Sequence, residues 1–357
     1  MKERFERNSS IELLRVIAII GVIILHYNSG EMGGGFRYVK EGSINQYYLY
    51  ITENLFICAV DLFILISAYF LSITKKRNFI KIVELIIQVI FFRCIFYVIS
   101  IFVYGTNFSV KGALGCLLPQ NYFVILYSVL YMLSPYINLL IEKLDKKYFT
   151  KLLVMLLGIF SVWTIVVDFL ENIKGEGLNG LSTVGMYGSQ YGFSIVNFIL
   201  IYFIGAYIRI NKINLKKKTM INLSILIFIF LFVSSIIEHK IGLVHTTTWN
   251  YNNPFVILFA TLIFLLFKDI RLKNKIINEL ARGTFTCFLF HGYFIAKLHI
   301  ENVVNDSIFT LIIHQICVAI FLYLISYIVY KIYEFCSKWF IKLIIPISEH
   351  IDISVSL

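Results

Sequence analysis

The sequence predicts an all-α, polytopic integral membrane protein. Hydrophobic residues make up 59% of the 357 residues and charged residues only 15%, whereas about 25% of residues are charged in a typical soluble domain. The apolar residues gather in ten segments separated by polar or basic connections. The basic residues alternate between the connections, as expected of a chain that crosses a bilayer repeatedly.

The ten apolar segments are the expected transmembrane helices, because about 20 apolar residues span the hydrocarbon core as a helix. The eighth is short and the ninth is interrupted by polar residues. The first has no small-residue cleavage site and leads into the polytopic pattern, so we expect a retained helix rather than a signal peptide. In chain order the segments cover residues 11–28, 54–73, 80–104, 121–141, 152–170, 193–210, 220–237, 254–267, 284–299 and 308–333.

The basic residues predict the orientation. Connections on one side of the predicted membrane hold 24 lysines and arginines, and those on the other side hold five. The basic side should be cytoplasmic, so we expect both termini in the cytoplasm. The net charge of +11 then reflects topology and anionic headgroups rather than nucleic-acid binding. The basic side comprises both terminal segments and the connections at 74–81, 142–151, 209–219 and 268–282.

Two connections on the opposite side have a distinctive composition. Residues 29–53 form a glycine-rich, aromatic loop, and residues 171–192 contain six glycines together with asparagine and tyrosine. A flexible loop of this kind suits sugar binding by stacking and hydrogen bonding, and it equally suits an ordinary solvated connection. The six cysteines show no C-x-x-C spacing, and no histidine–carboxylate spacing predicts a metal site.

Two ionisable residues share one face of the first segment. Arg15 and His26 are eleven residues apart, which on an α-helix is about 20° beyond three full turns and about 16 Å along the axis. Glu12 lies three residues before Arg15 and is placed to form an ion pair with it. Because charges are costly in a bilayer unless they face a cavity or a partner, this face is a candidate polar path. Simpler interpretations are that Arg15 snorkels to the cytoplasmic headgroups and that His26 is interfacial.

Three more ionisable residues inside predicted spans are candidates for the site. Arg93 is near the middle of the third span, where it needs an acidic partner, carbonyl groups or an anionic ligand. Asp61 in the second span is a candidate partner, and equally a helix-packing group. His291 in the ninth span is either a catalytic residue or a neutral histidine hydrogen-bonded between helices.

Taken together, these residues resemble the membrane acyltransferase-3 family of polytopic, acyl-CoA-dependent enzymes. Arg15 and His26 match its arginine–ten residues–histidine pattern, with Glu12 as the preceding acidic residue. Arg93 corresponds to an arginine typical of the third span. The resemblance extends over essentially the whole chain, in the right order.

Three shorter blocks support the resemblance. Residues 59–71, with Asp61 and Ser67, resemble the family's VDLFF-x-x-SG-x-L block, although Ala68 stands where glycine is usual. The segment from Tyr122 to Pro135 resembles WF…LYLLSP, with tyrosine replacing the common tryptophan. Residues 286–291 resemble the late YLIH motif, which ends at His291. The proline often found after the third-span arginine is missing.

The resemblance implies a single transmembrane acyltransferase domain, residues 1–357, and we expect no additional soluble esterase-like domain. It implies a plasma-membrane O-acyltransferase, most simply an O-acetyltransferase, that uses cytoplasmic acetyl-CoA or another acyl-CoA as donor substrate and has no permanently bound cofactor. The implied acceptor is an extracytoplasmic or lipid-linked surface polysaccharide such as capsule or exopolysaccharide. Membrane lipids are the other expected partners, nucleic acid is not expected, and a homodimer stays an open alternative.

We expect His26 to be the catalytic residue, as a general base on the acceptor hydroxyl or as a transient acyl carrier. Arg15, Arg93 and Glu12 are expected to bind acyl-CoA or to line the site, with supporting roles for Asp61, Ser67, Tyr122 and His291 and no metal. The competing hypothesis is a glycan exporter or flippase without acyl transfer. Against it, the spans show no inverted-repeat symmetry.

Overall fold

The structure is a computed structural model that describes residues 8–174, 177–243, 246–348 and 353–354. It is 76% helical, and its described residues contain a single two-stranded sheet, in which β1 (Lys76–Arg77) pairs antiparallel with β2 (Ile353–Ser354). The predicted all-α polytopic fold class is confirmed.

The described helices follow one another through short connections. In chain order they are α1 (Ser9–Asn28), α2 (Gly35–Tyr38), α3 (Ile44–Phe56), α4 (Ala59–Leu71), α5 (Ile80–Tyr104), α6 (Val110–Cys116), α7 (Tyr122–Glu142), α8 (Lys146–Leu157), the π-helix η1 (Gly158–Val162), α9 (Trp163–Lys174), η2 (Gln190–Gly192), α10 (Ile195–Ile210), α11 (Lys217–Lys240), η3 (Thr247–Trp249), α12 (Pro254–Lys268), α13 (Lys275–Leu280), η4 (Ala281–Gly283), α14 (Thr284–Ile295), η5 (Ile300–Asn302) and α15 (Ile308–Ser348).

All ten predicted segments are helical, and eight helical units of the described chain are long and apolar enough to cross a membrane. The two shorter ones are α10, with 16 residues, and α14, with 12 residues. Twelve residues rise only about 18 Å, so α14 does not cross the hydrocarbon core by itself. The eight units are Ser9–Asn28, Ile44–Leu71, Ile80–Tyr104, Tyr122–Glu142, Lys146–Lys174, Lys217–Lys240, Thr247–Lys268 and Ile308–Ser337.

Polar residues at the segment boundaries determine where several helices begin. The Asn8 side chain accepts a hydrogen bond from the Ser10 N–H at the start of α1, and Asn121 caps α7 in the same way. Asn253 caps α12, where Pro254 occupies the first helical position and needs no N–H partner. These caps place the polar boundary residues at the ends of the apolar helices, where unpaired N–H groups need partners.

The structure corrects the prediction of a loop over residues 29–53. Residues 44–53 belong to α3, which continues into α4 after a break at Ile57 and Cys58. Polar residues in and beside this segment are paired inside the protein. Asn28 Nδ2 donates to Glu53 Oε2 at 2.9 Å, and Asn54 Nδ2 donates to Ser235 Oγ at 2.9 Å.

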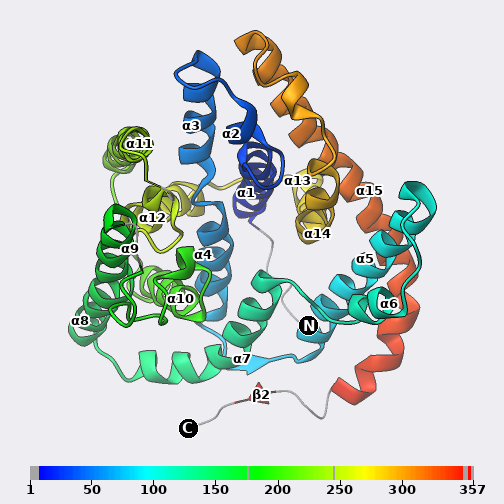
Figure 1. Cartoon of the computed structure of the whole chain (residues 1–357). Coiled ribbons are helices and arrows are strands. Elements are labelled where there is room, and N and C mark those ends of the chain that lie inside the picture. The colour runs from blue at the N-terminus through cyan, green and yellow to red at the C-terminus, as the bar shows by residue number, and fades with distance from the viewer. Residues whose placement is uncertain (1–7, 175–176, 244–245, 349–352, 355–357) are drawn as a thin grey trace.

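Helix α1 lies in the middle of the molecule, between a group containing α4 and α8 to α12 and a group containing α5, α14 and α15 (Figure 1). Two glycines allow close helix contacts. A Cβ on Gly21 of α1 would lie 2.4 Å from Cδ1 of Phe56, and one on Gly205 of α10 would lie 2.6 Å from Cβ of Ala68. Small residues at such crossings bring helices together in a bilayer, where lipid does not drive them to associate.

Contacts between connections agree with the predicted alternation. At the predicted cytoplasmic end, the Ser10 hydroxyl lies 2.8 Å from the carbonyl of Ile270, and Lys75 forms an ion pair of 2.9 Å with Glu142. At the opposite end, the Lys40 N–H donates to the Asn305 side chain at 2.7 Å. Each contact joins segments that the alternation places on the same side.

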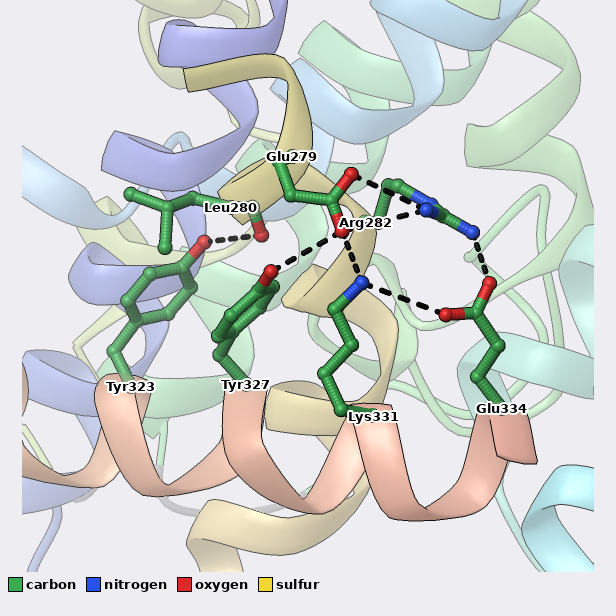
Figure 2. A network of polar contacts seen from close by, with 7 residues as sticks. All are labelled: Glu279, Leu280, Arg282, Tyr323, Tyr327, Lys331 and Glu334. Atoms are coloured by element: carbon green, nitrogen blue, oxygen red, sulfur yellow. Dashed lines mark hydrogen bonds and ion pairs between the residues drawn. The ribbon is translucent and has the colours of Figure 1, made fainter. Parts of the chain in front are cut away.

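A network of charged residues joins α13 and η4 to α15 (Figure 2). Glu279 accepts from Lys331, from Arg282 at 3.2 Å and from the Tyr327 hydroxyl at 3.1 Å. Lys331 and Arg282 both also pair with Glu334. The hydrogen bond from Lys331, reinforced by Arg282 and Tyr327, lowers the pKa of Glu279 to about 2. The network therefore holds α13 and η4, which directly precede α14, against the long helix α15.

Candidate functional site

The site forms where the last turn of α1 meets α14. His26 lies in the last turn of α1, and His291 is buried in α14, 1% exposed. Nδ1 of His26 is 2.7 Å from Nε2 of His291, and the two rings stack with centroids 4.8 Å apart and an interplanar angle of 16°. Two histidines that are 265 residues apart in sequence thus form one hydrogen-bonded pair.

The backbone of α14 determines how protons are arranged in this pair. Nδ1 of His291 is 2.7 Å from the carbonyl oxygen of Cys287, which can only accept, so this nitrogen holds a proton. In a neutral ring, Nε2 of His291 is then an acceptor, and the hydrogen bond between the rings must come from Nδ1–H of His26. The remaining nitrogen, Nε2 of His26, has a free lone pair. The hydrogen bonds from the Cys287 carbonyl through His291 to His26 therefore leave His26 Nε2 as the basic atom. In a catalytic triad, a hydrogen bond to one ring nitrogen of histidine likewise leaves the other nitrogen as the base.

Two adjoining cavities lead from Arg15 toward the pair. The lower one, of about 220 Å³, is lined by Arg15 and Ser67, and the upper one, of about 80 Å³, reaches Val22, one turn before His26. The upper cavity also reaches Phe288, whose ring lies 6.3 Å from that of His291. The two cavities share four lining residues and therefore adjoin, and together they are here called the cavity path; the four are Phe63, Phe123, Thr284 and Phe285.

Arg15 lines the lower cavity. Its Nη1 lies 3.4 Å from Oε2 of Glu12, at the outer limit of a direct ion pair, and its side chain is 32% exposed. A guanidinium held loosely by one carboxylate keeps donors for another anion. Ser67 lines the same cavity, while its hydroxyl donates to the carbonyl of Phe63 at 2.9 Å.

Asp61 and Arg93 do not form a pair. Nη2 of Arg93 donates to the carbonyl of Gly115 at 3.1 Å and to Oε1 of Gln120 at 3.0 Å, so its partners lie in α6 and in the connection between α6 and α7. Asp61 is 0% exposed, and neither of its carboxylate oxygens has a hydrogen-bond partner among the described residues. Arg93 therefore uses carbonyl groups, one of the alternatives that its position in the sequence left open.

Tyr122 begins α7 directly after its cap. Its ring lies 4.7 Å from that of Phe193, and it is 42% exposed. The next residue, Phe123, lines both cavities. Tyr122 thus stands between the cavity path and the segment that follows η2.

In the sequence, Arg77 is only one of several basic residues in the 74–81 connection. It is 1% exposed; its Nε donates to Ser134 Oγ at 2.7 Å, and its Nη2 donates to the carbonyl of Leu71 at 2.9 Å. Arg77 therefore ties the end of α4 to α7 through the serine of the Ser134–Pro135 pair. That pair, which begins eleven residues after Tyr122–Phe123 in the same apolar segment, was the available signal.

Among the residues that the structure describes, no group of three or more histidine, cysteine or acidic side chains is placed to hold a metal ion. In comparisons with known proteins, the family whose sequence model matches is described as an acyltransferase domain, and the match spans residues 8–331. No curated protein and no solved structure gives a significant match.

Proposed function

Because the chain belongs to the membrane acyltransferase-3 family, we propose that it transfers an acyl group, most simply acetyl, from cytoplasmic acyl-CoA to a hydroxyl of an extracytoplasmic or lipid-linked surface glycan. The plasma membrane is the proposed location. The observation that carries the proposal is the histidine pair, whose proton arrangement is set by the Cys287 carbonyl, together with two adjoining cavities that extend from Arg15 toward it, as far as Val22 and Phe288.

The shape of the path suits a long, thin donor. The upper cavity is apolar except for Thr284, so the phosphates of CoA would stay at the Arg15 end, where a guanidinium offers charge-assisted hydrogen bonds. Arg15 and His26 are about 16 Å apart along α1. A flexible pantetheine arm would span this distance and bring the thioester to the histidine pair.

In the proposed reaction, the oxygen of the acceptor hydroxyl attacks the thioester carbonyl carbon while His26 Nε2 accepts the proton of that hydroxyl. The tetrahedral intermediate collapses, the C–S bond breaks, and the CoA thiolate takes the proton from His26. Products are the glycan ester and CoA, with no net change in protons or electrons. His291 accepts from His26 Nδ1–H throughout and so holds the ring in the required tautomer.

The test of this function is whether acetyl transfer requires the donor and the acceptor on opposite sides of the membrane. The purified protein is reconstituted in vesicles with one uniform orientation, and labelled acetyl-CoA is supplied on the Arg15 side with a glycan acceptor on the other side. We expect labelled glycan only when both are present and the donor is on that side. Glycan that crosses the membrane without acetyl-CoA and without label would instead establish an exporter or flippase.

A further inference from the structure

A second polar cavity, here called the outer pocket, lies where α9, the 177–193 segment and η3 meet. Its volume is about 110 Å³. It is on the side of the molecule that the basic residues predict to be extracytoplasmic, opposite the Arg15 end of the cavity path. Its polar and aromatic lining includes Asp168, Glu171, Asn172, Tyr187, Gln190 and Tyr191.

Hydrogen bonds hold the walls of the outer pocket together. The buried carboxylate of Asp168 accepts from the Ser189 N–H at 2.9 Å, from the Ser189 hydroxyl and from Asn250 Nδ2 at 2.8 Å. Glu171 Oε1 accepts from the N–H of Leu178 at 2.8 Å. The loop is therefore fixed to α9 and to η3, and the pocket is built before any ligand binds.

Two residues of the lining hold an unfavourable backbone conformation. Gln190 and Tyr191 have φ of 54° and 56°, a left-handed region in which a Cβ is unfavourable. The same loop uses glycine at Gly188 and Gly192, where φ is 78° and 83°. Glycine would be the less strained choice at 190 and 191 as well, and strained residues of this kind gather at binding sites, which supports a functional role for these two side chains.

The lining has the chemistry of a site for a neutral sugar. Carboxylate and amide groups bind hydroxyl groups, and the exposed rings of Tyr187 (73% exposed) and Tyr191 (45% exposed) offer flat apolar faces. The lining as described contains no lysine or arginine, whereas it contains Asp168 and Glu171. A uronic acid or a phosphorylated sugar would therefore meet repulsion there.

Aromatic rings connect the outer pocket to the cavity path. The rings of Tyr191 and Phe193 have centroids 6.4 Å apart, and those of Phe193 and Tyr122 are 4.7 Å apart. Tyr122 directly precedes Phe123, which lines both cavities of the cavity path. A glycan that rests in the outer pocket therefore has a stacking surface that leads toward the reacting end.

We propose that the outer pocket is an acceptor subsite that binds a neutral hexose or N-acetylhexosamine unit of the glycan and selects against anionic sugars. This inference rests on the proposed function, which it deepens by naming the class of acceptor. Gln190 and Tyr191 then act as ligands in the strained loop, and Tyr187 closes the stacking surface.

The test is sugar binding by the purified full-length protein in detergent, followed by tryptophan fluorescence. Trp163 donates to the carbonyl of Leu181 at 2.9 Å, and Trp249 ends η3, so natural reporters flank the outer pocket. The probes are the trisaccharide of N-acetylglucosamine and trigalacturonic acid. The variants are Tyr191→Gly, which suits the left-handed backbone, and Tyr187→Ala, which truncates an exposed side chain.

We expect saturable binding of the neutral trisaccharide and at least about tenfold weaker binding of trigalacturonic acid. Either variant should weaken neutral-sugar binding about tenfold without lowering the melting temperature. The proposal is overturned if the wild type does not bind the neutral sugar, if it binds the acidic sugar as tightly, or if both variants bind like the wild type.

His26→Ala separates this inference from the proposed function. We expect this variant to bind the neutral trisaccharide like the wild type while it fails to transfer acetyl. Sugar binding by a wild-type protein that cannot use acetyl-CoA would overturn the proposed function and leave the outer pocket as a glycan site. Acetyl transfer without neutral-sugar binding would overturn the outer pocket alone.

Discussion

Nδ1 of His26 and Nε2 of His291 are 2.7 Å apart, although the two residues belong to the first and the fourteenth α-helix. The Cys287 carbonyl requires a proton on the other nitrogen of His291, so His291 accepts from His26 rather than donating to it. Nε2 of His26 is thereby left as the base, and the acceptor for its Nδ1–H is a second histidine rather than a carboxylate.

The first prediction concerns His291. Replacing it with alanine removes the acceptor for His26 Nδ1–H, so we expect kcat to fall by about 10²-fold with little change in KM for acetyl-CoA. His291→Gln retains an acceptor oxygen near the position of Nε2 and should recover part of the rate. Steady-state kinetics of both variants are the measurement. Equal losses in both would show that His291 acts only through packing.

A second prediction separates the two intramembrane arginines. Arg15→Ala removes the cation that lines the lower cavity, so KM for acetyl-CoA should rise about tenfold while kcat changes little. Arg93→Ala should change KM less, because the Arg93 guanidinium already donates hydrogen bonds to Gly115 of α6 and to Gln120, which follows α6. Equal KM values in Arg15→Ala and the wild type would remove Arg15 from the donor site.

A third prediction tests the path itself. Thr284 lines both cavities, so Thr284→Phe should narrow the passage and lower kcat/KM for acetyl-CoA at least about tenfold. Thr261→Phe is the matched control, because Thr261 lines a separate apolar cavity between α8, α10 and α12. Initial rates over a range of donor concentrations measure the difference. If both variants behave alike, the donor does not use this path.

A fourth prediction concerns helix packing. In Gly205→Ala the new Cβ would lie 2.6 Å from Cβ of Ala68 and 3.0 Å from the carbonyl of Leu65, so α10 and α4 must move apart. We expect a loss of about 1–3 kcal/mol in the free energy of unfolding. Gly158→Ala is the control, since nothing lies within 4 Å of its added Cβ. Thermal unfolding in detergent should show a lower melting temperature for Gly205→Ala alone.

A fifth prediction follows from the pKa of Glu279, which Lys331, Arg282 and Tyr327 lower from 4.5 to about 2. A lowered carboxyl pKa contributes stability above pH 4.5, and this contribution is lost as the pH falls toward 2. Glu279→Gln should therefore melt below the wild type at pH 7, by an amount that corresponds to at most about 1 kcal/mol for an exposed network. The two melting curves should converge near pH 2; a constant difference at all pH values would contradict the assigned ionisation.

The sequence predicted the elements of this fold well because most of its signal is local. Runs of apolar residues and the alternation of basic connections placed ten helical segments, and helical periodicity placed Arg15 and His26 on one face. The segment around Glu53 was missed because its polar side chains are paired in the interior, which no local pattern reveals. The charge pattern also left open whether Arg93 bonds to Asp61 or to carbonyl groups.

The site itself was only partly predictable. His291 was a candidate, but its contact with His26 joins residues 265 positions apart, and the proton arrangement depends on the Cys287 carbonyl that only the fold brings close. Arg77 looked like any basic residue of a connection, since its burial depends on α4 and α7 packing around it. The unusual composition of residues 171–192 was visible in the sequence, whereas the positive φ of Gln190 and Tyr191 is visible only in the structure.

The most direct test of the central claim is acetyl transfer by His26→Ala. Labelled acetyl-CoA and a glycan acceptor are given to equal amounts of wild-type and variant protein, with the melting temperature of each as the control for folding. We predict a loss of at least about 10²-fold in transfer rate, because the variant lacks the base while the His291–Cys287 hydrogen bond persists. Transfer at the wild-type rate by a folded His26→Ala protein would contradict the account.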